Sequence, residues 1–91
     1  MSTDKFAIES LALDLKRVAL GYYNGSERTA KRFSEEALKR KDEISIVNLK
    51  PYFRRKIQSL PAMLSQKDKK KLAEDALMYS TLVQNYALKN F

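Results

Sequence analysis

The chain has 91 residues and a formal net charge of +7, and 44% of its side chains are hydrophobic. That length predicts a single domain, and that hydrophobic fraction is typical of globular rather than disordered chains. The chain contains no cysteine and no histidine, which excludes disulfide bridges, thiolate metal sites and the most common general base.

The apolar runs of the sequence are too short for a membrane span. The longest are only about four residues, whereas a spanning helix needs roughly 20. The first six residues, Met1 to Phe6, lack the basic-then-apolar layout of a signal peptide. We therefore expect a soluble, cytoplasmic protein.

Positive charge is concentrated in the second half of the chain. Residues 1–43 carry nine basic and eight acidic side chains, whereas residues 50–71 carry eight basic side chains and one acidic side chain, Asp68. The window 50–71 therefore has a net charge of +7, as large as that of the whole chain. Such asymmetry predicts an acidic partner.

The first predicted helix spans residues 4–21, with Thr3 or Asp4 as its N-cap. Gly21 and the pair Asn24-Gly25 predict the end of this helix and a tight turn into the next one, because both residue types tolerate the left-handed conformation. Spacings of three and four give the helix one apolar face, which consists of Ile8, Leu11, Leu15, Val18 and Tyr22.

A second, sparser apolar stripe lies on another side of the same helix. It consists of Phe6, Leu13 and Leu20, which recur every seven residues. One interpretation is that the helix is sandwiched inside the bundle. The other is that the stripe is the surface of a homodimer or of a partner complex, because a small bundle usually leaves one side of each helix in water.

The second predicted helix spans residues 26–42, with Ser26 as its N-cap. Its packing face is small in volume, and the rest of the helix is charged, which predicts a solvated outer helix. The packing face consists of Ala30, Phe33, Ala37, Arg40 and Ile44. The favourable i,i+4 ion pairs predicted on its surface are Glu27–Lys31, Glu35–Lys39 and Glu36–Arg40.

The third predicted helix spans residues 48–60, after an extended link at 45–47. Asn48 is the expected N-cap, Pro51 falls in the first turn, and Pro61 is expected to end the helix. The residues predicted to face the core are Leu49, Tyr52, Phe53, Ile57 and Leu60. The apolar linker 60–64 is expected to tuck under the bundle.

The last predicted helix spans residues 65–90 and carries the longest packing face. Ser65 and Asp68 form a candidate capping box at its start. The packing face has the spacing 4-3-4-3-4 and consists of Leu72, Ala76, Tyr79, Val83, Tyr86 and Asn90. Four such helices without period-two alternation predict an all-α fold, a small four-helix bundle with short turns and no sheet.

One local rule is broken at the start of the last helix. Lysines gather at a helix N-terminus, where the helix dipole disfavours positive charge, and such violations often accompany function. If the last two helices form a hairpin, basic residues from both converge on a candidate anion or partner site. This site consists of Arg54, Arg55, Lys56, Lys67, Lys69, Lys70 and Lys71. The alternative is that these lysines only confer solubility.

Three kinds of anionic partner could bind this basic cluster: nucleic acid, an anionic membrane surface and an acidic protein surface. Pro51-Tyr-Phe-Arg-Arg-Lys56 interleaves aromatic and basic residues as single-strand binders do, although Tyr52 and Phe53 also fit the core. No helix-turn-helix, zinc-finger, RNP, KH or P-loop motif is present in the sequence. An anionic membrane surface is disfavoured, because no bulky apolar face accompanies the basic helix ends. An acidic protein surface requires no motif.

The sequence offers little for catalysis. Its adjacent acidic pairs diverge by about 100° on a helix, and the Glu-x-x-His ligands of di-metal bundles are ruled out without histidine. We therefore expect no enzyme activity, no metal and no cofactor. The prediction is a helical adaptor or regulatory module that docks an acidic protein partner through residues 50–71, with homodimerisation through the first helix as a further option. The alternative is a nucleic-acid-binding protein that uses the same basic cluster.

Overall fold

The computed structural model describes residues 3–91, and within that range every regular element is helical. The predicted all-α four-helix bundle is confirmed, with the third helix split into two pieces. The elements are α1 (Thr3–Tyr23), α2 (Glu27–Asp42), the 3-10 turn η1 (Ile46–Asn48), α3 (Pro51–Gln58), α4 (Leu60–Leu64) and α5 (Lys69–Asn90).

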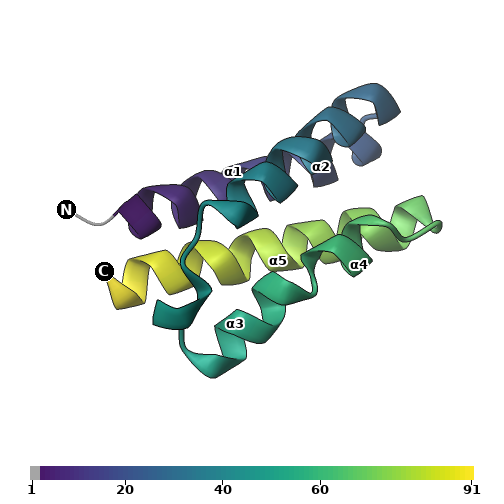
Figure 1. The fold of residues 1–91 in the computed structure, drawn as a ribbon. Helices are drawn as coiled ribbons and strands as arrows, with labels where there is room; N and C mark the ends of the chain where they lie inside the picture. The colour runs from purple at the N-terminus through teal and green to yellow at the C-terminus, as the bar shows by residue number, and fades with distance from the viewer. Residues whose placement is uncertain (1–2) are drawn as a thin grey trace.

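Helix α1 packs along both α2 and α5, so the first helix is as central to the fold as the last (Figure 1). Helices α1 and α5 run antiparallel, and the start of α1 and the end of α5 lie at the same end of the molecule. Helix α4 contacts both α5 and α2, and α3 contacts α4 and the 3-10 turn. One continuous core of aliphatic side chains, Phe53 and Tyr86 fills the space between these helices.

The predicted packing faces of α1 and α5 are confirmed. In α1, Ile8, Leu11, Leu15 and Val18 are fully buried. In α5, the buried members of the face are Leu72, Ala76, Val83 and Tyr86, with Tyr79 and Asn90 half-buried. A buried hydrogen bond from the Ser80 hydroxyl to the Ala12 carbonyl oxygen (2.7 Å) sets which residues of α1 and α5 lie side by side. Helix α1 already includes Thr3 and Asp4, so the prediction that one of them is its N-cap is wrong.

The second stripe of α1 is exposed, so its sandwiched interpretation is wrong. The exposed fractions are 69% for Phe6, 49% for Leu13 and 45% for Leu20. The neighbours α2 and α5 flank α1 on its buried side, and no further helix of the described chain covers the opposite side. A 91-residue chain has too few elements to enclose every helix.

The turn between α1 and α2 forms as predicted, but its two glycines have different roles. Gly25 has the left-handed φ of 74° that closes the turn. Gly21 does not end the helix, because α1 continues to Tyr23. Gly21 instead allows α2 to approach, since a Cβ atom there would lie 2.8 Å from the backbone nitrogen of Ala30.

Helix α2 is a solvated outer helix, as predicted, with Ala30 and Ala37 buried. Ser26 occupies the N-cap position, but its hydroxyl donates to the Thr29 hydroxyl oxygen and makes no capping bond. Of the predicted ion pairs, Glu27–Lys31 forms at 3.2 Å. Two are replaced by i,i+3 pairs: Lys39 pairs with Glu36, and Arg40 pairs with Glu43.

The third helix differs most from the prediction. Residues 46–48 form a 3-10 turn rather than an extended link, and Lys50 rather than Asn48 precedes the helix at Pro51. Tyr52 is not core, because half of its surface is exposed, whereas Phe53 and Ile57 are fully buried. The aromatic pair 52–53 therefore divides between solvent and core.

Pro61 does not end the helical path, because it lies in the first turn of α4, which begins at Leu60. The backbone N–H groups of the first helical turn make no hydrogen bond within the helix, so a proline there, which has no N–H, costs nothing. The linker 60–64 does tuck into the bundle, with Leu60 and Met63 buried.

Helix α5 begins at Lys69, four residues later than predicted. Its N-cap is Asp68, whose carboxylate accepts a hydrogen bond from the Lys71 backbone N–H at 3.1 Å. Ser65 bonds back to the Ala62 carbonyl oxygen, so the predicted capping box does not form.

Candidate partner-binding surfaces

The structure brings the seven predicted basic residues together only in part. Lys56 of α3 lies close enough to Asp75, the ion-pair partner of Lys71, for its charge to help lower the pKa of that carboxyl, whereas Arg54 lies nearer the start of α3. Arg54, Arg55 and Lys56 are on α3, whereas the lysines at 67 and 69–71 surround the start of α5. The Phe53 ring is stacked on that of Tyr86, with centroids 3.7 Å apart. Tyr86 follows Lys71 by 15 residues, or about 22 Å along a helix. The structure therefore does not bring Arg54 together with the α5 lysines.

Several of these cations already have partners inside the protein. The Arg54 guanidinium donates to the carbonyl oxygens of Ile46 (3.0 Å) and Leu49 (3.2 Å), so it braces the 3-10 turn. Lys56 lies over the Tyr79 ring at 5.1 Å, and Lys69 lies over the Tyr22 ring at 5.6 Å.

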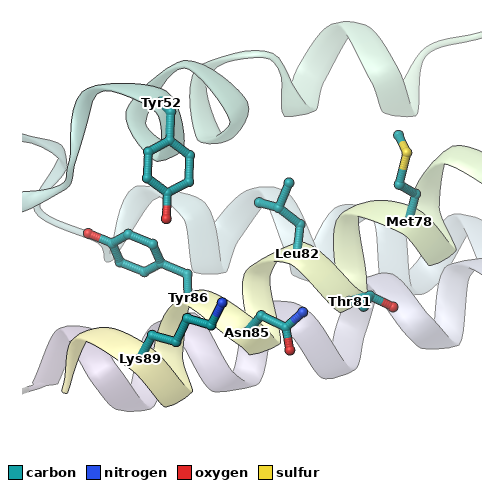
Figure 2. Close-up of a pocket in the computed structure, with 7 residues that line it drawn as sticks. All are labelled: Tyr52, Met78, Thr81, Leu82, Asn85, Tyr86 and Lys89. Atoms are coloured by element: carbon teal, nitrogen blue, oxygen red, sulfur yellow. The ribbon is translucent and has the colours of Figure 1, made fainter.

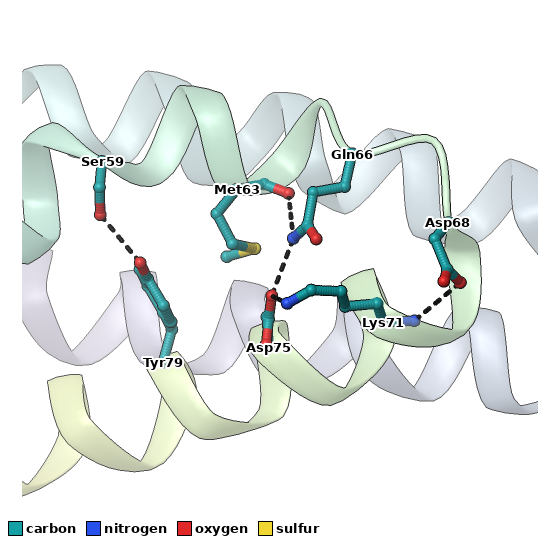
Figure 3. A network of polar contacts seen from close by, with 7 residues as sticks. All are labelled: Ser59, Met63, Gln66, Asp68, Lys71, Asp75 and Tyr79. Carbon is teal, nitrogen blue, oxygen red and sulfur yellow. Dashed lines mark hydrogen bonds and ion pairs between the residues drawn. The ribbon is translucent and has the colours of Figure 1, made fainter.

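A polar network holds the start of α5 in place (Figure 3). The Gln66 amide donates to the Met63 carbonyl oxygen and to the Asp75 carboxylate, both at 2.9 Å, and Lys71 pairs with Asp75 at 3.3 Å. The Gln66 hydrogen bond, with Lys71 beside it, lowers the pKa of Asp75. These contacts give the helix start a structural role.

A groove between α3 and α5 is the feature that sequence reasoning missed (Figure 2). It has a volume of about 550 Å³, and we call it the α3/α5 groove. Its lining residues are Tyr52, Met78, Thr81, Leu82, Asn85, Tyr86 and Lys89. The four-, three- and four-residue spacing of Met78, Leu82, Asn85 and Lys89 was a visible signal of this second face of α5.

The walls of the α3/α5 groove are positioned by aromatic packing. The Tyr86 ring lies edge-on to Tyr52, with centroids 6.1 Å apart, and its hydroxyl oxygen accepts the Lys50 backbone N–H at 3.1 Å. This bond ties the start of α3 to α5. Tyr52 points from α3 toward Tyr86 while Leu82 rises from α5, so the groove has an apolar floor.

The charge around the α3/α5 groove is predominantly positive at the Lys89 end. Lys89 is a lining residue, and no lining residue is acidic. Arg55 and Lys56 follow Tyr52 by one helical turn, so they share its side of α3. Glu74 and Asp75 lie about one turn before Met78 on α5, beyond the lining residues, and Asp75 faces Lys56, so positive charge dominates only at the Lys89 end.

A second groove lies between α1 and α5, on the exposed side of α1. It has a volume of about 380 Å³, and we call it the α1/α5 groove. It contains two members of the predicted stripe, Phe6 and Leu13, together with Leu88 of α5. Glu9 and Lys16 lie beside them.

A buried carboxyl group lies between α1 and α2. Asp14 is 7% exposed, and one of its oxygens has no hydrogen-bond partner. Burial raises the pKa of Asp14, and the charges of Arg40 and Arg17 only partly oppose this rise. The folded state therefore retains the Asp14 proton at pH values where the unfolded state has lost it.

Replacing Asp14 by asparagine should remove this pH dependence. Because the folded pKa lies above the unfolded value of 3.8, stability falls as the pH rises from that value through the folded pKa. Urea unfolding between about pH 3.5 and pH 7 should show the wild type losing stability relative to Asp14→Asn. Parallel pH profiles for the two proteins would contradict the assignment.

Residues 3–91 contain neither a candidate metal site nor a membrane-spanning helix. No group of three or more histidine, cysteine, aspartate or glutamate residues in that range could hold a metal ion. Nor does that part of the chain contain a helix both long and apolar enough to cross a membrane.

The chain matches no protein-family model, no curated protein and no solved structure. The two grooves and the charges beside them are the features of the molecule that point to a function.

Proposed function

We propose that the protein is a non-enzymatic helical binding module that docks an acidic, partly apolar segment of a partner protein in the α3/α5 groove. The observation that carries this proposal is an apolar groove floor with Lys89 in its wall and no acidic lining residue. A partner helix or extended segment would place apolar side chains on Leu82 and Tyr52 and carboxylates near Lys89.

The predicted basic cluster contributes to this proposal unequally. Arg55 and Lys56 do not line the groove, but they follow Tyr52 by one turn of α3, so we assign them to the edge of the docking surface. The lysines around the start of α5 lie at the other end of that helix, so their proposed role is to attract an acidic partner from a distance, which raises the association rate.

Nucleic acid is the second candidate. It is favoured by the half-exposed Tyr52 ring, which shares its helix face with Arg55 and Lys56. A base could stack on such a ring while cations contact phosphates. The protein proposal ranks first because the groove floor is apolar and the remaining cations are dispersed.

The test is selection of peptides from a random display library, with reversal of the groove charge as the decisive variant. Peptides selected by the wild type should be acidic and amphipathic. These peptides should bind the double variant Met78→Glu/Lys89→Glu much more weakly, because the two introduced glutamates repel carboxylates at the groove. Both positions are solvent-exposed, so the variant should still fold.

A control variant reverses one positive charge elsewhere: Arg28→Glu on the exposed face of α2 should bind the selected peptides nearly as well as the wild type. Equal loss in the control and the groove variant would indicate a non-specific charge effect. Nucleic acid is tested separately by anisotropy with random RNA and DNA at about 50 and 200 mM salt. A log–log slope near −4 to −5, the value for roughly 4–6 phosphate contacts, would favour the second candidate.

A further inference from the structure

The exposed side of α1 and α5 carries an apolar strip that no element of the described chain covers. From α1 it includes Phe6, Leu13 and Leu20, and from α5 it includes Leu77 and Leu88, which share one side of that helix because they are 11 residues apart. Phe6 and Leu88 are its most exposed members, at 69% and 72%. We propose that this face binds a second copy of the same chain, with the two α1 helices antiparallel and the two-fold axis at Leu13.

The spacing of the strip is what fits a second copy. Phe6 and Leu20 are each seven residues from Leu13, so the strip is symmetric about Leu13. A two-fold axis at that residue places Leu13 against its own copy and Phe6 against the partner's Leu20. The contact is then self-complementary, as an isologous interface requires.

The charges beside the strip agree with this arrangement. Glu9 and Lys16 lie on the same side of it, because both line the α1/α5 groove. In an antiparallel two-fold dimer, the Glu9/Lys16 sides of the two α1 helices lie next to each other, and the two helices run in opposite directions. Glu9 of each copy therefore meets Lys16 of the other, giving two ion pairs. A parallel pairing would leave Glu9 and the partner's Lys16 about 10 Å apart along the helix axes.

The size of the face is also adequate. The molecule measures 37 by 21 by 20 Å, and the strip runs along its longest dimension. An entire side of the molecule of that length and width is close to the roughly 800 Å² per partner of a standard interface, so the proposed dimer buries most of this side, with the strip at its centre. This surface is separate from the α3/α5 groove, so a variant that abolishes dimerisation should still bind the partner in the groove, and the two proposals are tested independently.

Cysteine cross-linking tests the register, because the natural chain contains no cysteine and every introduced thiol is unique. Under mild oxidation at low micromolar concentration, Leu13→Cys should form a disulfide-linked dimer, since residues on the axis face each other. Phe6→Cys alone and Leu20→Cys alone should not, whereas an equimolar mixture of the two should cross-link. Glu35→Cys, on the exposed side of α2, sets the background of random collisions.

Charge exchange tests the ion pairs without any cross-link. Sedimentation equilibrium should show a wild-type dimer, weakened about tenfold in Glu9→Lys and in Lys16→Glu, and restored in the double variant. A wild type that stays monomeric at roughly 100 μM, where even weak specific association is detected, would overturn the proposal. So would Leu13→Cys cross-linking no faster than the Glu35→Cys control, or efficient cross-linking of Phe6→Cys alone, which indicates a parallel pairing.

Discussion

Replacing Phe53 by alanine is expected to lower the free energy of unfolding by about 3–5 kcal/mol. Phe53 is fully buried, and its ring lies face to face with Tyr86 at an interplanar angle of 4°. Its removal would leave a cavity where α3 meets α5, at the bond between Lys50 and Tyr86. Because small domains have only about 5–15 kcal/mol of total stability, this single change would remove a large share of it.

The neighbouring aromatic residue provides the control for Phe53. Tyr52 is half exposed, so Tyr52→Ala should cost only about 1 kcal/mol, the value typical of an average substitution. Urea unfolding followed by circular dichroism compares the two variants directly. Similar losses from both would mean that α3 does not pack against α5 as described.

Replacing Gly21 by alanine is expected to destabilise the protein by about 1–3 kcal/mol. In most helix interiors, exchanging glycine for alanine is stabilising by about 0.5–1 kcal/mol, so the expected sign is unusual. The cause is the close approach of α2: a Cβ atom at position 21 would lie 2.8 Å from the Ala30 nitrogen and 3.0 Å from its Cα. Backbone atoms cannot move aside as a flexible side chain can, so α1 and α2 would have to separate.

Substitutions of Gly25 are the control, because they show whether the turn tolerates side chains in general. A Cβ atom at position 25 meets nothing within 4 Å, but the φ of 74° disfavours most side chains. Gly25→Ala should therefore cost about 1–2 kcal/mol, and Gly25→Asn much less, because asparagine tolerates that conformation. Thermal or urea unfolding that found Gly21→Ala stabilising would show that the two helices are further apart than described.

The fold could be predicted from the sequence because helical periodicity determines which side of a helix is apolar. The packing faces of α1, α2 and α5 follow directly from spacings of three and four residues. The level at which one helix contacts another does not follow from periodicity. The predicted convergence of Arg54 with Lys69 needed a particular axial alignment of α3 and α5, and tertiary contacts such as Ser80 with Ala12 and Tyr86 with Lys50 determine such alignments.

Helix ends were harder to predict for a related reason. Ser65 and Asp68 are both good N-caps, and the choice between them depends on contacts that the local sequence does not contain. Gln66 bonds to Asp75 and to the Met63 carbonyl oxygen, which holds residues 65–67 outside the helix. Tyr52 was misplaced because two adjacent aromatic residues cannot both face the core of a short helix, and the pattern alone favoured neither.

The most direct test of the proposed docking is an amide NMR titration of the full chain with one of the selected acidic peptides. The account predicts saturable shifts concentrated on residues of the α3/α5 groove, with Tyr52, Met78, Asn85 and Lys89 among the largest. The exposed strip around Leu13 should remain unaffected. Shifts confined to the lysines at the start of α5, or spread evenly over the surface, would contradict the groove as the binding site.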